Sequence, residues 1–133
     1  MAIYSNQNQE FQIVDFSATH SQLLLRSFKT KDREYNIDII VKGVGLLLLP
    51  TSFLGIEISL LENKETISFL KDKFSFNNEY DNRIFSIKDN QGRVYYINAL
   101  CFGVYHNKLD ILETSIGRYD MESLGELEKW YAD

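Results

Sequence analysis

Two histidines, His20 and His106, are the residues of this chain best suited to acid–base chemistry near neutral pH. We expect His20 at the entry to a strand and His106 in a turn. Only a sheet that brought His20 close to Asp15 or Asp38 would create an acid–base pair. A metal site needs several His, Cys or carboxylate ligands at a characteristic spacing, and the sequence has no such pattern. We therefore expect surface histidines, with no catalytic residue, metal or cofactor.

The one cysteine, Cys101, could in principle be a reactive thiol. It lies between apolar neighbours in a predicted strand, and no cation close to it in the sequence would activate it, so we expect it to be buried and structural. A single cysteine excludes an internal disulfide and points to a reducing compartment, which makes a cytoplasmic location the expectation. No apolar run approaches the roughly 20 residues that a membrane helix needs, so we expect no membrane partner.

Two patterns partly match sequences that bind phosphate or nucleic acid. The run Gly43-Val44-Gly45 lacks the third glycine and the Gly-Lys-Ser/Thr of nucleotide-binding loops, so it predicts a bend between strands. One basic cluster also places cations beside aromatic rings, as single-strand binders do. Two acids dilute that cluster, and the net charge of −5 would repel phosphates, so we expect a solvated turn and no nucleic-acid partner. The cluster comprises Arg26, Phe28, Lys29, Lys31, Asp32, Arg33, Glu34 and Tyr35.

Negative charge is concentrated at the C-terminus. Residues 1–119 contain 14 acids and 13 bases, whereas residues 120–133 contain five acids and only Lys129 as a base. Asp120 is a suitable N-cap, and the spacing beyond it predicts an amphipathic helix packed on the body of the protein. The predicted apolar flank is Met121, Leu124, Leu127 and Tyr131, and the predicted solvent flank is Glu122, Glu126 and Lys129.

An acidic surface helix has two interpretations. The simpler one is a solvated face whose early acids complement the helix dipole. The functional one is an electrostatic docking surface for a basic protein, because a concentrated field steers a partner of opposite charge. The predicted partner-binding residues are Glu122, Glu126, Trp130 and Tyr131, the last two as aromatic anchors.

The elements that must position these residues are mostly short strands. In the clearest one, alternation puts Tyr35, Ile37, Ile39 and Val41 on a core face and Asn36, Asp38 and Lys42 on the opposite, solvent face. Seven or eight such strands predict an α+β fold that is mostly antiparallel β, either a curled sheet or a sandwich. We expect one domain over residues 1–133, with the polar residues 1–10 frayed.

The connections between strands carry their own signals. Residues 65–74 fit a helix through Ile67, Leu70 and Phe74 and a strand through Ile67 and Phe69. We favour a short helix, because Asn63 or Glu65 could serve its start and Lys71 and Lys73 suit its end. The Asp89-Asn90-Gln91-Gly92 run predicts a hairpin turn. A long strand should follow it from Arg93 to about Tyr105, and another strand should cover residues 109–116.

Several strand and turn residues together resemble a family pattern. They are the run from Thr19 to Arg26, Asn36-Ile37-Asp38-Ile39, Lys42-Gly43-Val44, Leu49-Pro50 and Asn98-Ala99. The pattern is similar to that of small uncharacterised β-rich bacterial proteins, some of which are assigned as immunity proteins of polymorphic toxin systems. The resemblance implies a non-enzymatic antidote that binds and blocks a toxin. It implies no catalytic positions.

Three functions therefore stay open. The first is a non-enzymatic binding module of the immunity type that docks a basic partner through its acidic C-terminal helix. The alternative is a small-ligand-binding protein or an enzyme that uses a concave, aromatic-lined sheet, with a pocket near His20, His106 or Tyr95 and Tyr96. The third is homo-oligomerisation through an exposed edge at Leu46–Leu49. The shortage of catalytic residues favours the first.

Overall fold

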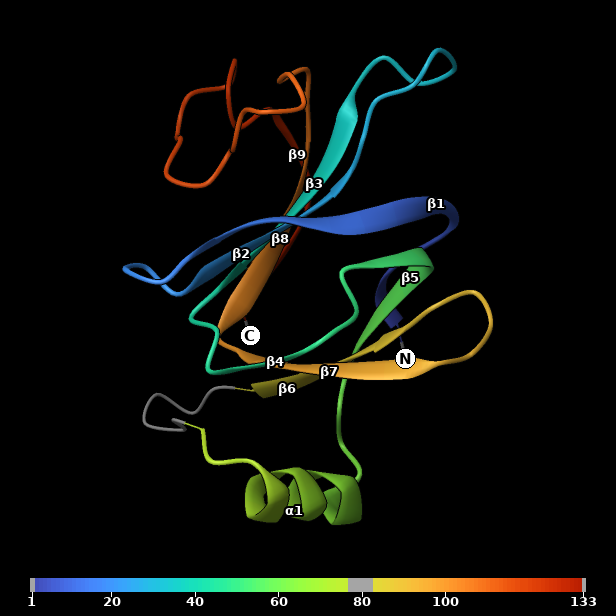
Figure 1. Cartoon of the computed structure of the whole chain (residues 1–133), viewed down its shortest axis with the longest axis vertical. Coiled ribbons are helices and arrows are strands. Elements are labelled where there is room, and N and C mark those ends of the chain that lie inside the picture. Colours follow the sequence, from blue (N-terminus) through green and yellow to red (C-terminus); the bar gives the residue numbers. More distant parts are fainter. Residues whose placement is uncertain (1, 77–82, 133) are drawn as a thin grey trace.

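The computed structural model describes residues 2–76 and 83–132, and within them nine strands and one helix follow one another along the chain (Figure 1). The strands are β1 (Ala2–Ser17), β2 (Gln22–Ser27), β3 (Asn36–Lys42), β4 (Leu46–Leu48), β5 (Ser52–Leu60), β6 (Arg83–Lys88), β7 (Val94–Ala99), β8 (Cys101–Asn107) and β9 (Glu126–Tyr131). The helix α1 (Lys64–Lys73) comes between β5 and β6. The prediction of an α+β fold dominated by antiparallel β structure is confirmed, with more strands than expected.

All the described strands belong to one sheet, in the order β4-β7-β6-β5-β1-β2-β3-β8-β9. The two ends of this sheet curl toward each other. The ring of Phe85 on β6 meets the ring of Phe102 on β8 edge-on at 5.4 Å and that of Tyr131 on β9 at 5.7 Å, although several strands separate them in the sheet order. Of the two predicted architectures, the curled sheet is therefore the one observed.

The predicted long strand after the Asp89 turn exists but turns a corner at Leu100. Before that residue β7 pairs with β4 and β6, and after it β8 pairs with β3 and β9. Gly43 packs against this corner with φ +70°, and a Cβ there would lie 2.8 Å from the Cβ of Leu100. Only glycine fits such a position without strain, so the predicted bend at Gly43 is confirmed.

The inner face of the curled sheet holds the main core, and alternation within the strands fills it. On β3 the side chains of Ile37, Ile39 and Val41 are buried in this core, and Tyr35 packs against it, as predicted. Strand β8 contributes Phe102 and Val104. Every second residue of a strand faces the same side, which is why this face could be predicted from the pattern alone.

The outer face of β3 differs from the prediction. Asn36, Asp38 and Lys42 lie on the face away from the main core, but Asp38 is 0% exposed and Asn36 is also buried. The expectation that these two side chains face solvent is wrong because the segment between β8 and β9 folds over this end of the outer face. There it covers a second, smaller apolar cluster of Leu24, Ile40 and Tyr105.

Three local expectations are corrected by the structure. Residues 2–10, expected to be frayed, form the first half of β1 and pair with β5 from Ala2 onward. Residues 109–116, expected to be a strand, consist of turns and irregular backbone. The predicted C-terminal helix is absent: residues 120–124 form turns, and Glu126–Tyr131 is the edge strand β9, antiparallel to β8.

The C-terminal segment is a strand because long-range pairing outweighs its helical spacing. A helix of about 11 residues with glycine in the middle is marginal in water. Gly125 has φ +92°, and a Cβ on it would collide with the carbonyl oxygen of His106. This left-handed turn sets Glu126 opposite His106, and the chain then runs along the free edge of β8.

The helix α1 lies within one residue of the expected range, and Asn63 is the one of the two candidate start residues that caps it. The side chain of Asn63 accepts a hydrogen bond from the backbone N–H of Thr66, and Lys71 and Lys73 lie in the last turn, where cations complement the helix dipole. In Figure 1 the helix lies below β6 and β7, with Leu70 as its buried side chain. Within residues 2–76 and 83–132, no helix combines the length and the apolar character needed to span a membrane.

Candidate functional site

The predicted partner-binding residues divide between the surface and the core. Glu122, Glu126 and Trp130 are exposed, the first in a turn and the other two on β9. The ring of Tyr131 instead stacks on Phe102 in the core, at 6.0 Å. Three of the four residues are therefore available to a partner, on a loop and an edge strand instead of a helix.

Exposed apolar side chains gather in the same part of the chain. Six of the eleven exposed large hydrophobic residues among the described ones lie between residues 111 and 130, and Leu112 is 95% exposed. These six are Ile111, Leu112, Tyr119, Met121, Leu127 and Trp130. We call the exposed side chains of residues 110–130 the C-terminal surface. This stretch of the chain therefore exposes more large apolar side chains than the rest of the described residues do.

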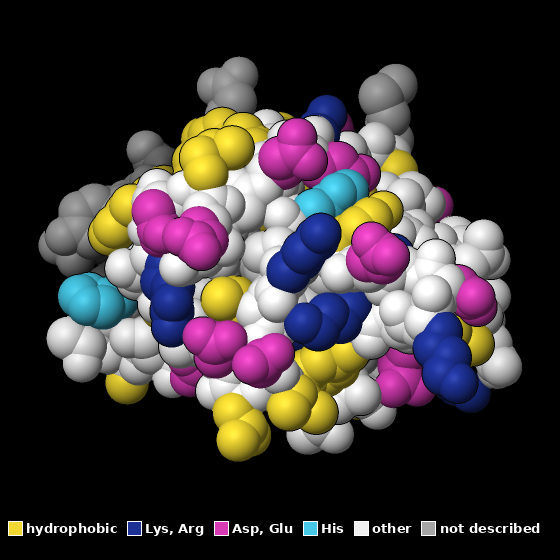
Figure 2. Space-filling view, turned by 90° about the horizontal axis from the view of Figure 1, so that it is seen from above, with side chains coloured by type: hydrophobic (Ala, Val, Ile, Leu, Met, Phe, Trp, Pro, Cys, Tyr) yellow, Lys and Arg dark blue, Asp and Glu magenta, His cyan; other side chains and the backbone are white. Residues whose placement is uncertain are grey.

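The net negative charge of the protein lies in the same segment. Residues 109–133 contain seven acids and two bases, whereas residues 1–108 contain twelve of each, so this segment accounts for the whole net charge of −5. Asp110, Asp120, Glu122, Glu126 and Glu128 are exposed there. Figure 2 looks onto the end of the molecule where the segment lies, and it shows acidic, basic and hydrophobic side chains next to one another on this face.

A buried ion pair beneath this surface organises it. Arg26 on β2 and Asp38 on β3 face each other across the strand pair, and both side chains are 0% exposed. Arg26 donates two parallel hydrogen bonds to the carboxylate, at 2.6 Å from Nε and 2.9 Å from Nη2. This bidentate geometry satisfies most of both ions, as a buried pair requires.

The ion pair reaches the loop over residues 108–125 through two of its atoms. Nη1 of Arg26 donates to the carbonyl oxygens of Glu113 at 2.8 Å and Asp110 at 3.4 Å. Oδ2 of Asp38 accepts a hydrogen bond from the hydroxyl of Ser115 at 2.7 Å. Ser115 is 0% exposed. Side chains of the sheet therefore hold the backbone and one side chain of a loop that has no regular secondary structure.

Two asparagines complete the attachment. Asn36 donates from Nδ2 to the carbonyl oxygen of Leu109 at 2.8 Å and to the side chain of Asn107 at 3.0 Å. Asn107 donates to Asp38 at 2.8 Å and to the carbonyl oxygen of Leu124 at 3.4 Å. The loop is thus fixed near its start, middle and end. We call Arg26, Asp38, Asn36, Asn107 and Ser115 the loop clamp.

Sequence reasoning missed the loop clamp and placed Arg26 in a solvated turn. The available signal was one ionisable residue inside each of two apolar strands, Leu23–Ser27 and Ile37–Val41. In a hairpin these two residues can lie opposite each other with complementary charges. Nothing local to Asn107 or Ser115 indicated that they would join the pair.

Both edges of the sheet are poorly suited to accepting a further strand. Strand β9 carries Glu126, Glu128 and Lys129, and its pairing with β8 is irregular between Val104 and Tyr105. The opposite edge, β4, has only three residues. Charges, bulges and short length are the usual means by which edge strands avoid intermolecular pairing. The edge at Leu46–Leu49, expected as a possible oligomeric contact, is therefore short.

His106 lies on β8 and not in a turn, in a small polar cluster. Its Nε2 is 2.5 Å from a carboxylate oxygen of Glu128, and its ring stacks on Tyr35 with centroids 4.4 Å apart. On β1, burial raises the pKa of Tyr4, with a lowering contribution from its hydrogen bond to Asn6. His20 is exposed in the turn before β2. His20 is therefore a surface histidine, as expected, and the carboxylate of Asp38 is occupied by Arg26.

Cys101 is 6% exposed, which confirms that it is mostly buried. Burial raises the pKa of its thiol, and the charges of Lys42 and Arg83 offset this only in part. A thiol of raised pKa is a poor nucleophile at neutral pH. The structure therefore agrees with a structural cysteine.

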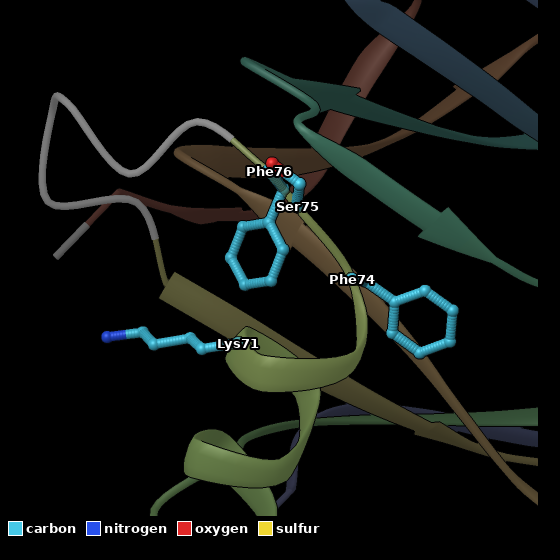
Figure 3. Close-up of a pocket in the computed structure, with 4 residues that line it drawn as sticks. All are labelled: Lys71, Phe74, Ser75 and Phe76. Atoms are coloured by element: carbon cyan, nitrogen blue, oxygen red, sulfur yellow. The ribbon is translucent and has the colours of Figure 1, made fainter.

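Two hollows in the described surface lie away from the predicted ligand residues. One of about 260 Å³ is lined by Lys71, Phe74, Ser75 and Phe76, where the chain leaves α1 (Figure 3). Figure 3 shows the side chains of Phe74 and Lys71 pointing to opposite sides there. Another hollow of about 230 Å³ is lined by Gln9, Glu10, Gln12, Ser27, Phe28 and Thr30. Neither includes a histidine, Tyr95 or Tyr96.

Comparisons with protein-family models, with curated proteins and with solved structures found no match to this chain. In the part of the chain that the structure describes, no group of three or more His, Cys, Asp or Glu side chains is placed to hold a metal ion.

Proposed function

We propose that this protein is a non-enzymatic binding module that docks a basic partner protein through the C-terminal surface. One observation carries the proposal: six of the eleven exposed large hydrophobic side chains among the described residues and the entire net charge share one segment, which hydrogen bonds from the sheet hold in place. Leu127, Trp130 and the apolar loop residues would supply the contact area, and the acids around them would attract the partner.

The partner class that we propose is a protein toxin, which would make the module an immunity-type antidote of a bacterial toxin system. Support comes from the resemblance in residues 19–50, which implies such an antidote. Antidotes of this kind act by binding, so they need a stable, pre-formed surface and no reactive groups. A cytoplasmic location agrees with this role and with the buried thiol of Cys101.

The test measures binding to the product of the gene next to this one, purified as an inactivated variant. Glu122→Lys with Glu126→Lys reverses the charge of the C-terminal surface. The matched control, Glu62→Lys with Asp72→Lys, makes the same change at two exposed sites around α1. We expect the first variant, but not the control, to bind at least about tenfold more weakly at low salt. Affinity that is unchanged by the reversal and by added salt would contradict electrostatic docking.

A growth assay tests the antidote role separately. Cells that produce the active neighbouring protein should survive when they also make the wild-type chain or the α1 control. They should lose that protection with the charge-reversed variant. Protection that is equal with all three would separate toxin neutralisation from the C-terminal surface, and no protection with any of them would contradict the antidote role.

A small-ligand or enzymatic role is the second candidate, favoured by the cluster around His106. The contact between His106 and Glu128 pairs an imidazole with a carboxylate, an arrangement that general acid–base catalysts use. A thermal-shift screen of small molecules tests it, with His106→Gln as the comparison. Stabilisation by a ligand that requires His106 would favour this candidate, and the same stabilisation in both proteins would exclude the cluster.

A further inference from the structure

We infer that Ser115 and Arg26 are positioning residues for docking: although neither is on the surface, they set the conformation of the loop over residues 109–124 and hence its affinity for a partner. This inference rests on the proposed function. Substitutions at these buried residues should change the conformation of the binding surface without touching it. The loop clamp thus has two roles, which are to stabilise the sheet and to orient the loop.

The loop cannot orient itself on the sheet through its own hydrogen bonds. Its backbone bonds close single turns, as when Glu113 N–H donates to Asp110, Arg118 N–H to Ser115 and Leu124 N–H to Asp120. Each of these bonds spans three or four residues, so together they shape the turns and leave the position of the turns relative to β2, β3 and β8 open. The contacts from the loop clamp supply that position.

Ser115 is the attachment at the middle of the loop. It lies between the exposed pair Ile111 and Leu112 and the exposed pair Tyr119 and Met121. Its hydroxyl reaches Asp38, while Arg26 holds the preceding turn through the carbonyl oxygen of Glu113. Apolar packing adds to this attachment, since Ile116 and Leu124 pack on Leu24, Ile40 and Tyr105. The two exposed pairs therefore project from a backbone that is fixed between them.

Removing the Ser115 hydroxyl should loosen the loop and leave the sheet intact. In Ser115→Ala, Asp38 keeps both hydrogen bonds from Arg26 and the one from Asn107. The loop loses a buried hydrogen bond to a charged group, which corresponds to a roughly ten- to hundredfold increase in the population of its open state. The change is therefore confined to the conformation of the loop.

Ser123→Ala is the matched control in the same loop. The hydroxyl of Ser123 contacts only loop residues, since it accepts from Nη1 of Arg118 and donates to the carboxylate of Asp120. Both variants remove one serine hydroxyl from the loop. Only Ser115→Ala cuts a connection to the sheet.

Amide hydrogen exchange measures the loop without any partner. We expect amides of residues 109–124 to exchange about ten- to a hundredfold faster in Ser115→Ala, while those of β2, β3 and β8 keep their wild-type rates. Ser123→Ala should leave the attachment of the loop to the sheet unchanged. Cleavage by trypsin after Arg118 gives a second readout and should be faster in Ser115→Ala than in the wild-type chain. Arg26→Lys, which keeps the charge but lacks the fork that reaches Asp110 and Glu113, should loosen the loop in the same way.

Affinity for the inactivated neighbouring protein completes the test. A loosened loop with weaker binding in Ser115→Ala supports the inference. Wild-type loop exchange in Ser115→Ala overturns it, whatever the affinity, and a loosened loop with unchanged affinity shows that its conformation does not govern docking. If the wild-type chain fails to bind this probe, the proposed partner is wrong, while the exchange experiment still decides whether the loop clamp holds the loop.

Discussion

Asp89 and Asp38 are both buried carboxylates that accept several hydrogen bonds. Their partners lie at very different distances along the chain. Asp89 is 3% exposed and accepts hydrogen bonds from the backbone N–H groups of Gln91 and Arg93 and from the hydroxyl of Tyr95. All three partners lie within six residues. Asp38 is bound by Arg26, Asn107 and Ser115, which lie 12, 69 and 77 residues away.

The difference separates the polar structure that a short motif encodes from the polar structure that only the fold creates. The network of Asp89 shapes one hairpin turn, and the Asp-Asn-Gln-Gly run predicted that turn directly. The network of Asp38 joins β2, β3, β8 and a loop, so each member is uninformative until the strands are paired. Burying a carboxylate is costly unless it is bound, and both sites meet that condition. The effects of substitution should differ accordingly.

The largest effect should come from Asp38→Ala. The charge of Arg26 would then stay buried without its counter-ion, which typically costs about 3–5 kcal/mol in the free energy of unfolding. Asp89→Ala should cost less, because it loosens a turn at the end of a hairpin and leaves no unpaired ion in the interior. Urea denaturation of both variants measures the difference.

A double substitution sharpens this result. Arg26→Met combined with Asp38→Leu removes both ions together, so it should be less destabilising than Asp38→Ala alone. Equal losses in the single and double variants would mean that packing, and not the buried charge, accounts for the cost.

Two glycines, one in open space and one against distant backbone, allow the same comparison for the backbone. Gly117 and Gly125 both have left-handed φ values, +82° and +92°, but a Cβ on Gly117 meets nothing within 4 Å. Gly117→Ala should therefore cost only the local strain of about 1–2 kcal/mol. Gly125→Ala should cost more, because its Cβ would collide with the carbonyl oxygen of His106 and displace β9. Melting temperatures of the pair test this, and equal values would show that β9 shifts freely.

The same distinction explains what the sequence could and could not predict. Alternation placed Ile37, Ile39 and Val41 in the core, and Asn63 marked the start of α1, because period and capping are local properties. The C-terminal segment was predicted as a helix because its spacing fits one locally. The free edge of β8 and the contact of Gly125 with His106 decide its structure, and both are brought there from elsewhere in the chain.

In the C-terminal strand β9, Leu127 is exposed, whereas Tyr131 packs against the core. Leu127 is 56% exposed, so Leu127→Ala should change the free energy of unfolding by no more than about 0.5 kcal/mol. The ring of Tyr131 packs against Phe85 and Phe102, and Tyr131→Ala should cost roughly 2 kcal/mol, less than for a fully buried ring. Chemical denaturation distinguishes the two. A large loss in Leu127→Ala together with a small one in Tyr131→Ala would favour the helical arrangement.

The smallest effect concerns the pH dependence contributed by Asp89. Burial alone would raise the pKa of this carboxyl, but the N–H groups of Arg93 and Gln91, the Tyr95 hydroxyl and the Arg93 charge together hold it below its ordinary 3.8. In that case the unfolded chain binds a proton at higher pH than the folded one. The resulting stabilisation is complete above the unfolded pKa and disappears as the pH falls through the lower, folded pKa.

The variant Asp89→Asn isolates this contribution. The asparagine carbonyl oxygen can still accept from the backbone N–H groups, so the turn is kept while the titrating group is removed. The wild-type protein should lose stability more steeply than Asp89→Asn as the pH falls from about 5 to about 2, and the two should run parallel above about pH 5. Urea midpoints measured across this range provide the test. Parallel curves down to pH 2 would mean that the turn does not stabilise the ionised form of Asp89 over a neutral side chain. Asp38 would then be bound as an ion, whereas Asp89 would act only as a neutral hydrogen-bond acceptor.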